Sequence, residues 1–199
     1  MPITINGSGT ITGLSAGGLP AGSVTGATLA SGVGGKILQV VSSTKTDAST
    51  TTTSSWADIA GTDQAGSGSI WCAKITPAAT SSKIWVLLNV NANAGDRYCG
   101  FKLLRDSTDI AIGDASGSCT RLTFSTFNQD EADDDLLMFN MGQNYIDSPS
   151  STSELTYKLQ WRNYSSGTVT TVINRLVSSS TDSWSGRGAS TITLVEIAG

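Results

Sequence analysis

Histidine is absent from this chain of 199 residues. Catalysis by serine–histidine–aspartate or cysteine–histidine groups needs an imidazole as general base, so neither is available, and no metal can be bound through histidine. Cysteine is also scarce: Cys72, Cys99 and Cys119 lie far apart, and no CxxC pair occurs. An odd count at this spacing predicts neither a disulfide framework nor a zinc site. Each cysteine lies among apolar residues of an expected strand, so we expect all three to be buried.

Positive charge is scarce as well. The chain has 12 Lys and Arg residues against 16 Asp and Glu residues, a net charge of −4. Nucleic acids and anionic membranes are bound through clustered basic residues, so we expect neither as a partner. No apolar run approaches the roughly 20 residues that span a bilayer. The first residues lack the basic and apolar segments of a secretion signal, so we expect the protein to fold in the cytosol where it is made.

Serine, threonine and glycine are plentiful instead, with 29, 26 and 22 residues, well over a third of the chain. All three are unfavourable inside helices. Threonine favours strands, while glycine and serine favour turns. The composition therefore predicts an all-β protein with many loops.

Residues 1–35 form a region of their own, with ten glycines and with neither a charged nor an aromatic residue. Within it, Leu14, Leu19, Val24 and Leu29 recur at every fifth position. A period of five fits neither a helix nor a single strand, but it suits an extended path of strands and turns. Compositions rich in Gly, Ser and Ala are also typical of flexible linkers. The regular apolar spacing favours an attachment and trimerisation arm, ordered by threefold association or by docking on another protein.

The sequence of residues 36–199 predicts a second region, a knob of short strands separated by turns. The expected strands cover residues 36–42, 56–59, 69–76, 83–90, 98–105, 110–112, 120–127, 136–141, 154–162, 168–175 and 190–197. Strict alternation of apolar and polar residues over 154–162 is the clearest signal, because period two is that of a half-buried antiparallel strand. No helix-length segment separates the strands. We therefore predict an antiparallel, jelly-roll-like β-sandwich.

Some strands allow finer predictions. The run 83–90 is apolar on both faces, which predicts a central strand that is covered on both sides. Trp71, Trp85 and Trp161 lie within strands, so we expect them in the core. The segment 168–175 is expected to form a hairpin with the strand before it.

Aromatic residues in loops are the candidate recognition residues. Trp184 and Arg187 lie together in a loop rich in Ser and Gly, and Tyr145 and Trp56 are further candidates. Flat aromatic faces beside polar groups can bind a receptor or a glycan. The alternative for Trp184 is that it caps one end of the sandwich.

The acidic stretch 130–135 is the one cluster with the chemistry of a cation site, because Ca²⁺ prefers carboxylate oxygens. It lacks the DxDxDG turn, so a solvated loop is the favoured interpretation. Glycosidases need two paired carboxylates. Asp58, Asp96, Asp114 and Glu154 are available, but nothing in the sequence pairs any two of them. We predict a protein without catalytic, cofactor or metal-binding residues.

Several phrases of the chain resemble structural proteins of tailed phages. The arm, ITINGSGTITGLSAGGLPAGSVTGATLASG, is similar to the start of tail-fibre and virion proteins, above all in phages of cyanobacteria and marine bacteria. The knob has similar phrases in the same order, and together they span most of the chain: KILQVVSSTKTD, SSKIWVLLNV, FKLLRDSTDIAIGD and STITLVEIAG.

The resemblance implies a homotrimer in the virion, assembled in the cytoplasm of the host bacterium. It implies a tail fibre or adhesin whose arm binds a tail, baseplate or major capsid protein, and whose knob contacts the host, with a surface glycan as a candidate partner. The alternative is a head fibre or a decoration (cement) protein that stabilises the capsid at threefold positions.

Overall fold

The structure is a computed structural model of the chain. It describes residues 36–95, 98–127, 137–164, 169–178, 183 and 185–199, and of the first 35 residues only β1 (Thr4–Ile5) and β2 (Ile11–Thr12). These two strands pair in antiparallel fashion. Backbone contacts divide the chain into two units, residues 1–36 and residues 37–199, which are described separately. The second unit is all-β, and its described residues include no helix.

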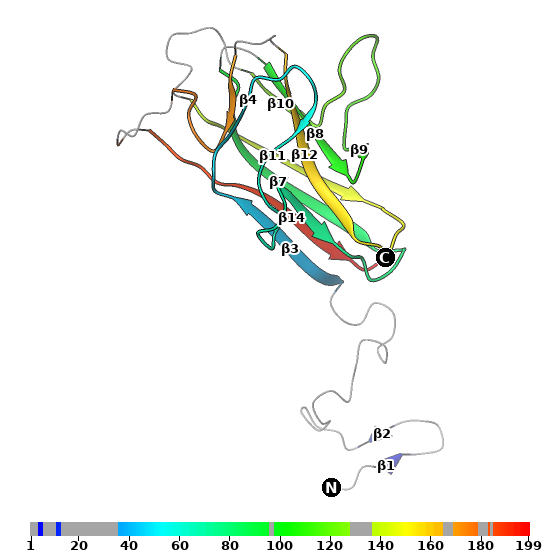
Figure 1. The fold of residues 1–199 in the computed structure, drawn as a ribbon. Coiled ribbons are helices and arrows are strands. Elements are labelled where there is room, and N and C mark those ends of the chain that lie inside the picture. Colours follow the sequence, from blue (N-terminus) through cyan, green and yellow to red (C-terminus); the bar gives the residue numbers. More distant parts are fainter. Residues whose placement is uncertain are drawn as a thin grey trace. The chain divides into compact units, whose positions relative to one another are not determined.

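The second unit contains two antiparallel sheets of six strands each (Figure 1). We call the first the β7 sheet. It comprises β3 (Ile37–Lys45), β4 (Ser49–Thr51), β7 (Lys83–Asn93), β11 (Phe139–Asp147), β13 (Thr171–Ile173) and β14 (Ser190–Ile197). β7 pairs with β11 on one side and with β14 and β13 on the other. β3 and β4 pair with the outer sides of β14 and β13.

The second sheet is called the β8 sheet. It comprises β5 (Ala57–Asp58), β6 (Cys72–Ile75), β8 (Tyr98–Arg105), β9 (Thr108–Ile110), β10 (Phe124–Phe127) and β12 (Leu155–Asn163). β8 and β12 pair with each other in the middle. β9 and β10 lie along the free side of β8, and β5 and β6 lie along the free side of β12.

The strand pairs are nested in chain order. β3 pairs with β14, β4 with β13, β5 and β6 with β12, β7 with β11, and β8 with β9 and β10. Each pair encloses the next one along the chain, as in one long hairpin rolled into two sheets. The chain therefore passes repeatedly between the sheets, which is consistent with a β-sandwich.

The core lies between the two sheets. Along β12, buried and half-buried residues alternate without a break, as the sequence predicts. β7 alternates in the same way, so that Val86 and Leu88 point inward. These residues belong to one buried cluster with Phe101, Tyr157 and Leu159 of the β8 sheet. Burying an aliphatic or aromatic side chain contributes roughly 1.5–3 kcal/mol, so this cluster is the main source of the stability of the knob.

A buried polar cluster also joins the two sheets at the end of β11. The Asp147 carboxylate, whose side chain is 6% exposed, accepts hydrogen bonds from Nη1 of Arg105 at 2.7 and 2.8 Å. It also accepts a hydrogen bond of 2.7 Å from the Tyr157 hydroxyl. Burial and the neighbouring Asp147 carboxylate both raise the pKa of Tyr157, so this hydroxyl remains a hydrogen-bond donor. The cluster holds β11 against β8 and β12.

A second carboxylate, Glu196 of β14, is tied to its neighbours at one end of the β7 sheet. Gln39 Nε2 donates to it at 2.6 Å, and the Ala78 amide donates to it at 2.6 Å. Burial alone would raise the pKa of Glu196, but these hydrogen bonds to the charged form outweigh it and lower the pKa. The ionised carboxylate therefore stabilises this end of the sheet.

Three predictions about burial are wrong: those for Trp85, for the outward face of 83–90 and for Cys119. Trp71 and Trp161 lie in the core as expected. β7 is a central strand, but its outward side is not fully covered, because Trp85 is 37% exposed. An apolar run shows that both faces of a strand can be buried. It does not show that another part of the protein covers both faces. Cys119 is exposed, because it lies in the turn-containing segment before β10 and not in a strand; Cys72 and Cys99 are buried as predicted.

The predicted hairpin of residues 168–175 with the preceding strand is also wrong. β13 pairs with β4 and β7 of the other sheet. Both sides of β12 are already occupied, by β8 on one side and by β5 and β6 on the other. The following strand therefore has no free side to pair with.

Candidate functional site

Several of the predicted site residues lie outside the described residues. They are Leu14, Leu19, Val24 and Leu29 of the arm, Trp184, and the acidic stretch 130–135. Their roles stay predictions.

The other three predicted residues lie in different parts of the knob. Trp56 is half-buried just before β5, and Nζ of Lys102 lies 4.6 Å from the centre of its ring. Tyr145 lies in β11 and not in a loop, where it packs against the core. Arg187 is exposed, and its backbone forms a β-bridge with Arg175. The three residues thus have different surroundings: Lys102 for Trp56, the core for Tyr145 and Arg175 for Arg187.

The outer face of the β7 sheet has an apolar region that we call the apolar band. It consists of the exposed residues Ile37, Leu38, Val40, Trp85 and Ile146 and of Val195, which is only 7% exposed. Val40 pairs with Val195, Val195 with Trp85, and Trp85 with Ile146, so one row of the sheet is apolar across four strands. Five of the nine large hydrophobic side chains that are exposed among the described residues belong to this band, including Val40 at 60% and Ile146 at 54%. Such clustering marks an interaction surface, whereas scattered exposed side chains need no explanation.

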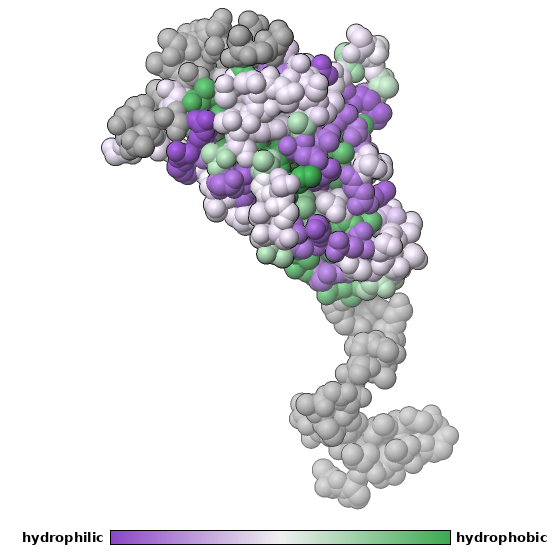
Figure 2. All heavy atoms as spheres, viewed as in Figure 1, coloured by the Kyte–Doolittle hydropathy of each residue, from purple (hydrophilic) through white to green (hydrophobic). Residues whose placement is uncertain are grey.

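A β-bulge enlarges the band at the start of β3. The pairing of β3 with β14 shifts between Glu196 and Ile197, which leaves Leu38 as the extra residue. A bulge changes the direction of the side chains around it. As a result Ile37 and Leu38, although adjacent in sequence, are both exposed. Hydrophobic residues are visible at the lower edge of Figure 2, where β3 begins in Figure 1.

The remainder of this face is polar but almost uncharged. Ser42 and Thr193 share a hydrogen bond of 2.8 Å, and the Asn140 side chain donates to Asn89 at 2.6 Å. Lys83 is the only charged residue at an outward position in four described strands of this sheet, namely β3, β14, β7 and β11. Copies of this acidic protein would therefore meet little repulsion if they packed through this face.

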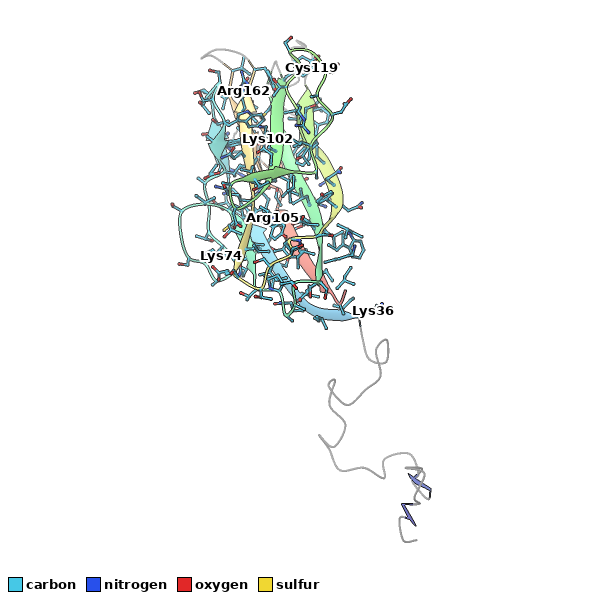
Figure 3. All side chains as sticks on the ribbon, turned by 90° about the vertical axis from the view of Figure 1, so that its right-hand side faces the viewer. Lys36, Lys74, Lys102, Arg105, Cys119 and Arg162 are labelled. Carbon is cyan, nitrogen blue, oxygen red and sulfur yellow. The ribbon has the colours of Figure 1, made fainter. Side chains whose placement is uncertain are left out.

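The outer face of the β8 sheet has a different character. Lys158 pairs with Asp58 at 2.8 Å, and Lys102 pairs with Asp109 at 2.6 Å. These partly exposed ion pairs contribute about 0–1 kcal/mol each, so their main effect is to keep this face solvated. The basic side chains Lys74, Lys102 and Arg162 are spread along this part of the knob (Figure 3).

The described residues offer little for metal or nucleophilic chemistry. Among them, no group of three or more Cys, Asp or Glu side chains is arranged to hold a metal ion. Asp58 is engaged by Lys158 and Gln160 and is not paired with another carboxylate. Burial raises the pKa of the Cys99 thiol to about 12 and also raises that of Cys72, so neither forms a thiolate near neutral pH.

The apolar band was not predicted, although the sequence contains a signal for it. Four of the five residues 37–41 are aliphatic. An edge strand with one buried face needs an apolar residue only at every second position, so the surplus indicates apolar residues on the outer face as well. Ile146 gave no such signal, because its strand was predicted to end at Met141 and in fact continues to Asp147.

No helix long and apolar enough to cross a membrane was found among the described residues. No protein-family model matches the chain, and a search of curated proteins found no significant match.

Proposed function

We propose that the protein is a non-enzymatic, homotrimeric structural protein of a phage virion, most specifically a tail fibre or adhesin. In this proposal residues 1–35 attach the protein to a tail, baseplate or capsid protein, and the knob faces the host surface. The phage assignment and the number three are based on the ordered sequence phrases that resemble virion proteins.

We further propose that the knob is a jelly roll. The nested strand pairs support this, because a jelly roll is a double sheet in which one long hairpin is rolled up. Viral capsid and lectin domains are among the proteins built in this way, so the topology is compatible with the proposed role. Fold alone does not assign the function, which depends on the surfaces.

The observation that carries the proposal is the apolar band. Its exposed side chains lie at the end of the β7 sheet where β3 begins. Covering each of them in an interface would contribute up to roughly 1.5–3 kcal/mol. Few charges surround the band, which limits repulsion between identical copies, and closed cyclic symmetry is the usual arrangement of such copies.

Locating the chain on the particle tests the proposed position. Gold labelling of a tag at the C-terminus, viewed by electron microscopy of intact phage, should mark the tail or baseplate. Label at regular positions on the head would replace the tail-fibre assignment by a head fibre or decoration protein. An absence of label on particles whose other structural proteins are detected would contradict the virion role.

Adsorption tests the proposed host contact. Saturating amounts of the purified full-length protein should reduce phage adsorption to host cells by competing for the receptor. Unchanged adsorption would contradict an adhesin. Loss of capsid resistance to heat or osmotic shock in particles that lack the protein would instead support the decoration role.

A further inference from the structure

The outer face of the β8 sheet contains an open surface pocket of about 350 Å³ near the start of β8. It is lined by Tyr98, Cys119, Thr120, Leu122, Ser125 and Tyr164. The two tyrosines are the most exposed aromatic side chains of this face, at 51% and 38%. We call this site the tyrosine pocket.

The pocket depends on a glycine in the middle of the sheet. A Cβ atom at Gly100 would lie 2.7 Å from Cδ2 of Leu122 and 3.0 Å from Cε2 of Tyr164. Both side chains therefore lie directly against the backbone of β8, in space that any other residue would fill. The Tyr164 amide also donates to the Tyr98 carbonyl at 3.1 Å, which ties the two tyrosine-bearing segments together.

The loop that forms the other wall is held in place by backbone contacts. The Thr123 amide donates to the Phe101 carbonyl at 2.9 Å, and the Gly113 amide donates to the Leu122 carbonyl at 3.0 Å. The Thr123 hydroxyl accepts from the Leu103 amide at 2.8 Å. The wall is thus preorganised on the sheet, which lowers the entropic cost of binding a ligand.

A cation lies beside the pocket. Arg162 is opposite Gly100 in the β8–β12 ladder, and its guanidinium carbon lies 5.0 Å from the centre of the Tyr164 ring. Its Nε is buried and has no hydrogen-bond partner, and none of the ion pairs among the described residues involves it. The other outward cations of this face, Lys74, Lys102 and Lys158, each have a carboxylate partner.

These features together specify the chemistry of a ligand. An aromatic face binds the apolar C–H face of a pyranose ring, and the hydroxyls of Thr120 and Ser125 can bond to sugar hydroxyls. The guanidinium of Arg162 matches a carboxylate. A volume of about 350 Å³ is at the small end of the range for ligand sites, which suits one or two sugar rings.

We propose that the tyrosine pocket binds an acidic pyranose, a uronic acid unit of a surface polysaccharide, with its ring against Tyr164 and its carboxylate at Arg162. This inference deepens the host-contact part of the proposed function and depends on it for its biological role. The binding itself can be tested separately from the trimer and from the location on the virion.

The test is saturation-transfer NMR on the full-length protein with methyl glycosides of glucuronic, galacturonic and mannuronic acid. The corresponding neutral glycosides of glucose, galactose and mannose are the matched controls, since they lack only the carboxylate. At least one uronide should receive saturation on its ring protons and bind in the millimolar range. It should bind about tenfold more tightly than its neutral counterpart, because a hydrogen-bonded charge pair is stronger than a neutral contact.

Substitutions separate the two contacts. Tyr164→Ala should abolish the transfer, whereas Tyr164→Phe, which keeps the ring, should retain most of it. Arg162→Gln should reduce uronide binding to the level of the neutral glycoside. Gly100→Ala should weaken binding at least tenfold by displacing Tyr164 and Leu122. Gly142→Ala is its control, because the added Cβ would meet only the Leu88 carbonyl at 3.7 Å.

Cys119 gives a second measurement. It lines the pocket and is exposed, while Cys72 and Cys99 are buried, so it should react first with iodoacetamide. A bound uronide should slow this reaction in the native protein but not in Tyr164→Ala.

The proposal is overturned if no uronide shows transfer that depends on Tyr164, or if the neutral glycosides bind as well as the uronides. Light scattering on the same samples reports the trimer independently. A trimer that binds no uronide would therefore contradict this proposal and leave the oligomer intact.

Discussion

Both sheets of the knob consist of strands in which buried and more exposed residues alternate, but their outer faces differ in chemistry. The face of the β7 sheet is neutral and has an apolar row from Val40 to Ile146. The face of the β8 sheet has ion pairs around Lys102 and Lys158 and a pocket between exposed tyrosines. An apolar neutral face gains free energy when another copy covers it, whereas a charged face loses hydration when it is covered. This contrast supports the proposals that the β7 face assembles with other copies and that the β8 face contacts an outside ligand.

The largest expected effect comes from breaking the apolar band. Val40→Asp places a charge in the middle of the proposed interface and removes roughly 1.5–3 kcal/mol of burial in each copy. Three copies act together, so the association constant of the trimer should fall about a thousandfold or more. Sedimentation across a dilution series measures this.

Thr44→Asp is the matched control for that prediction. Thr44 lies on the same strand and the same face, four residues away and outside the band. The Thr44→Asp substitution adds the same charge as Val40→Asp but should leave the trimer intact. Equal effects of the two variants would contradict an interface centred on the band.

The next largest effect is expected between the faces, at the buried carboxylate that joins the sheets. Asp147→Ala leaves Arg105 and the Tyr157 hydroxyl without their partner. Removing one member of a buried pair costs about 3–5 kcal/mol, and the partial exposure of Arg105 favours the lower value. Urea unfolding should show this loss, measured in the Val40→Asp background so that assembly does not contribute. A loss below about 1 kcal/mol would show that the cluster does not hold the sheets together.

A smaller effect is expected for an ion pair on the outer face of the β8 sheet. Lys158→Ala removes the partner of Asp58 at a partly exposed site. The free energy of unfolding should fall by only about 0–1 kcal/mol, because solvent screens such pairs. The same urea titration measures it. A loss as large as that of Asp147→Ala would mean that this face is structural and not merely solvated.

The smallest effect is expected from pH. The pKa of Glu196 is lowered in the folded state, so its contribution is fully present above the ordinary value of 4.5. The contribution is lost as the pH falls through the folded pKa. Thermal unfolding followed from neutral pH downward should therefore show a decline in stability at acid pH that is smaller in Glu196→Gln. An identical decline in both proteins would assign the acid sensitivity to other carboxylates, such as Asp63, whose pKa is also lowered.

The positions of the strands could be predicted better than their partners. The segments 98–105 and 190–197 were predicted with the bounds that the structure has, because each is a run of strand-forming residues next to turn residues. The partner of 168–175 could not be predicted locally, since it depends on which sides of the neighbouring strands are already occupied. Pairing in a sheet is a long-range property.

The surfaces were harder to predict than the strands. Trp85 looks like a core residue in sequence, and only the register with Val195 and Ile146 places it in an exposed row. The tyrosine pocket is lined by Tyr98 and Tyr164, which are far apart in sequence. It also depends on Gly100, because any side chain at that position would fill part of the space. No local pattern indicates such a combination.

Hydroxyl-radical footprinting of the full-length protein tests the central claim most directly, because it reads both faces in one sample. At a concentration where light scattering gives three chains, Trp85 and Ile146 should be protected from oxidation, while Tyr98 and Tyr164 should be oxidised freely. In Val40→Asp, Trp85 and Ile146 should lose that protection and the tyrosines should not change. Equal oxidation of Trp85 and Ile146 in the native and variant proteins would contradict the account.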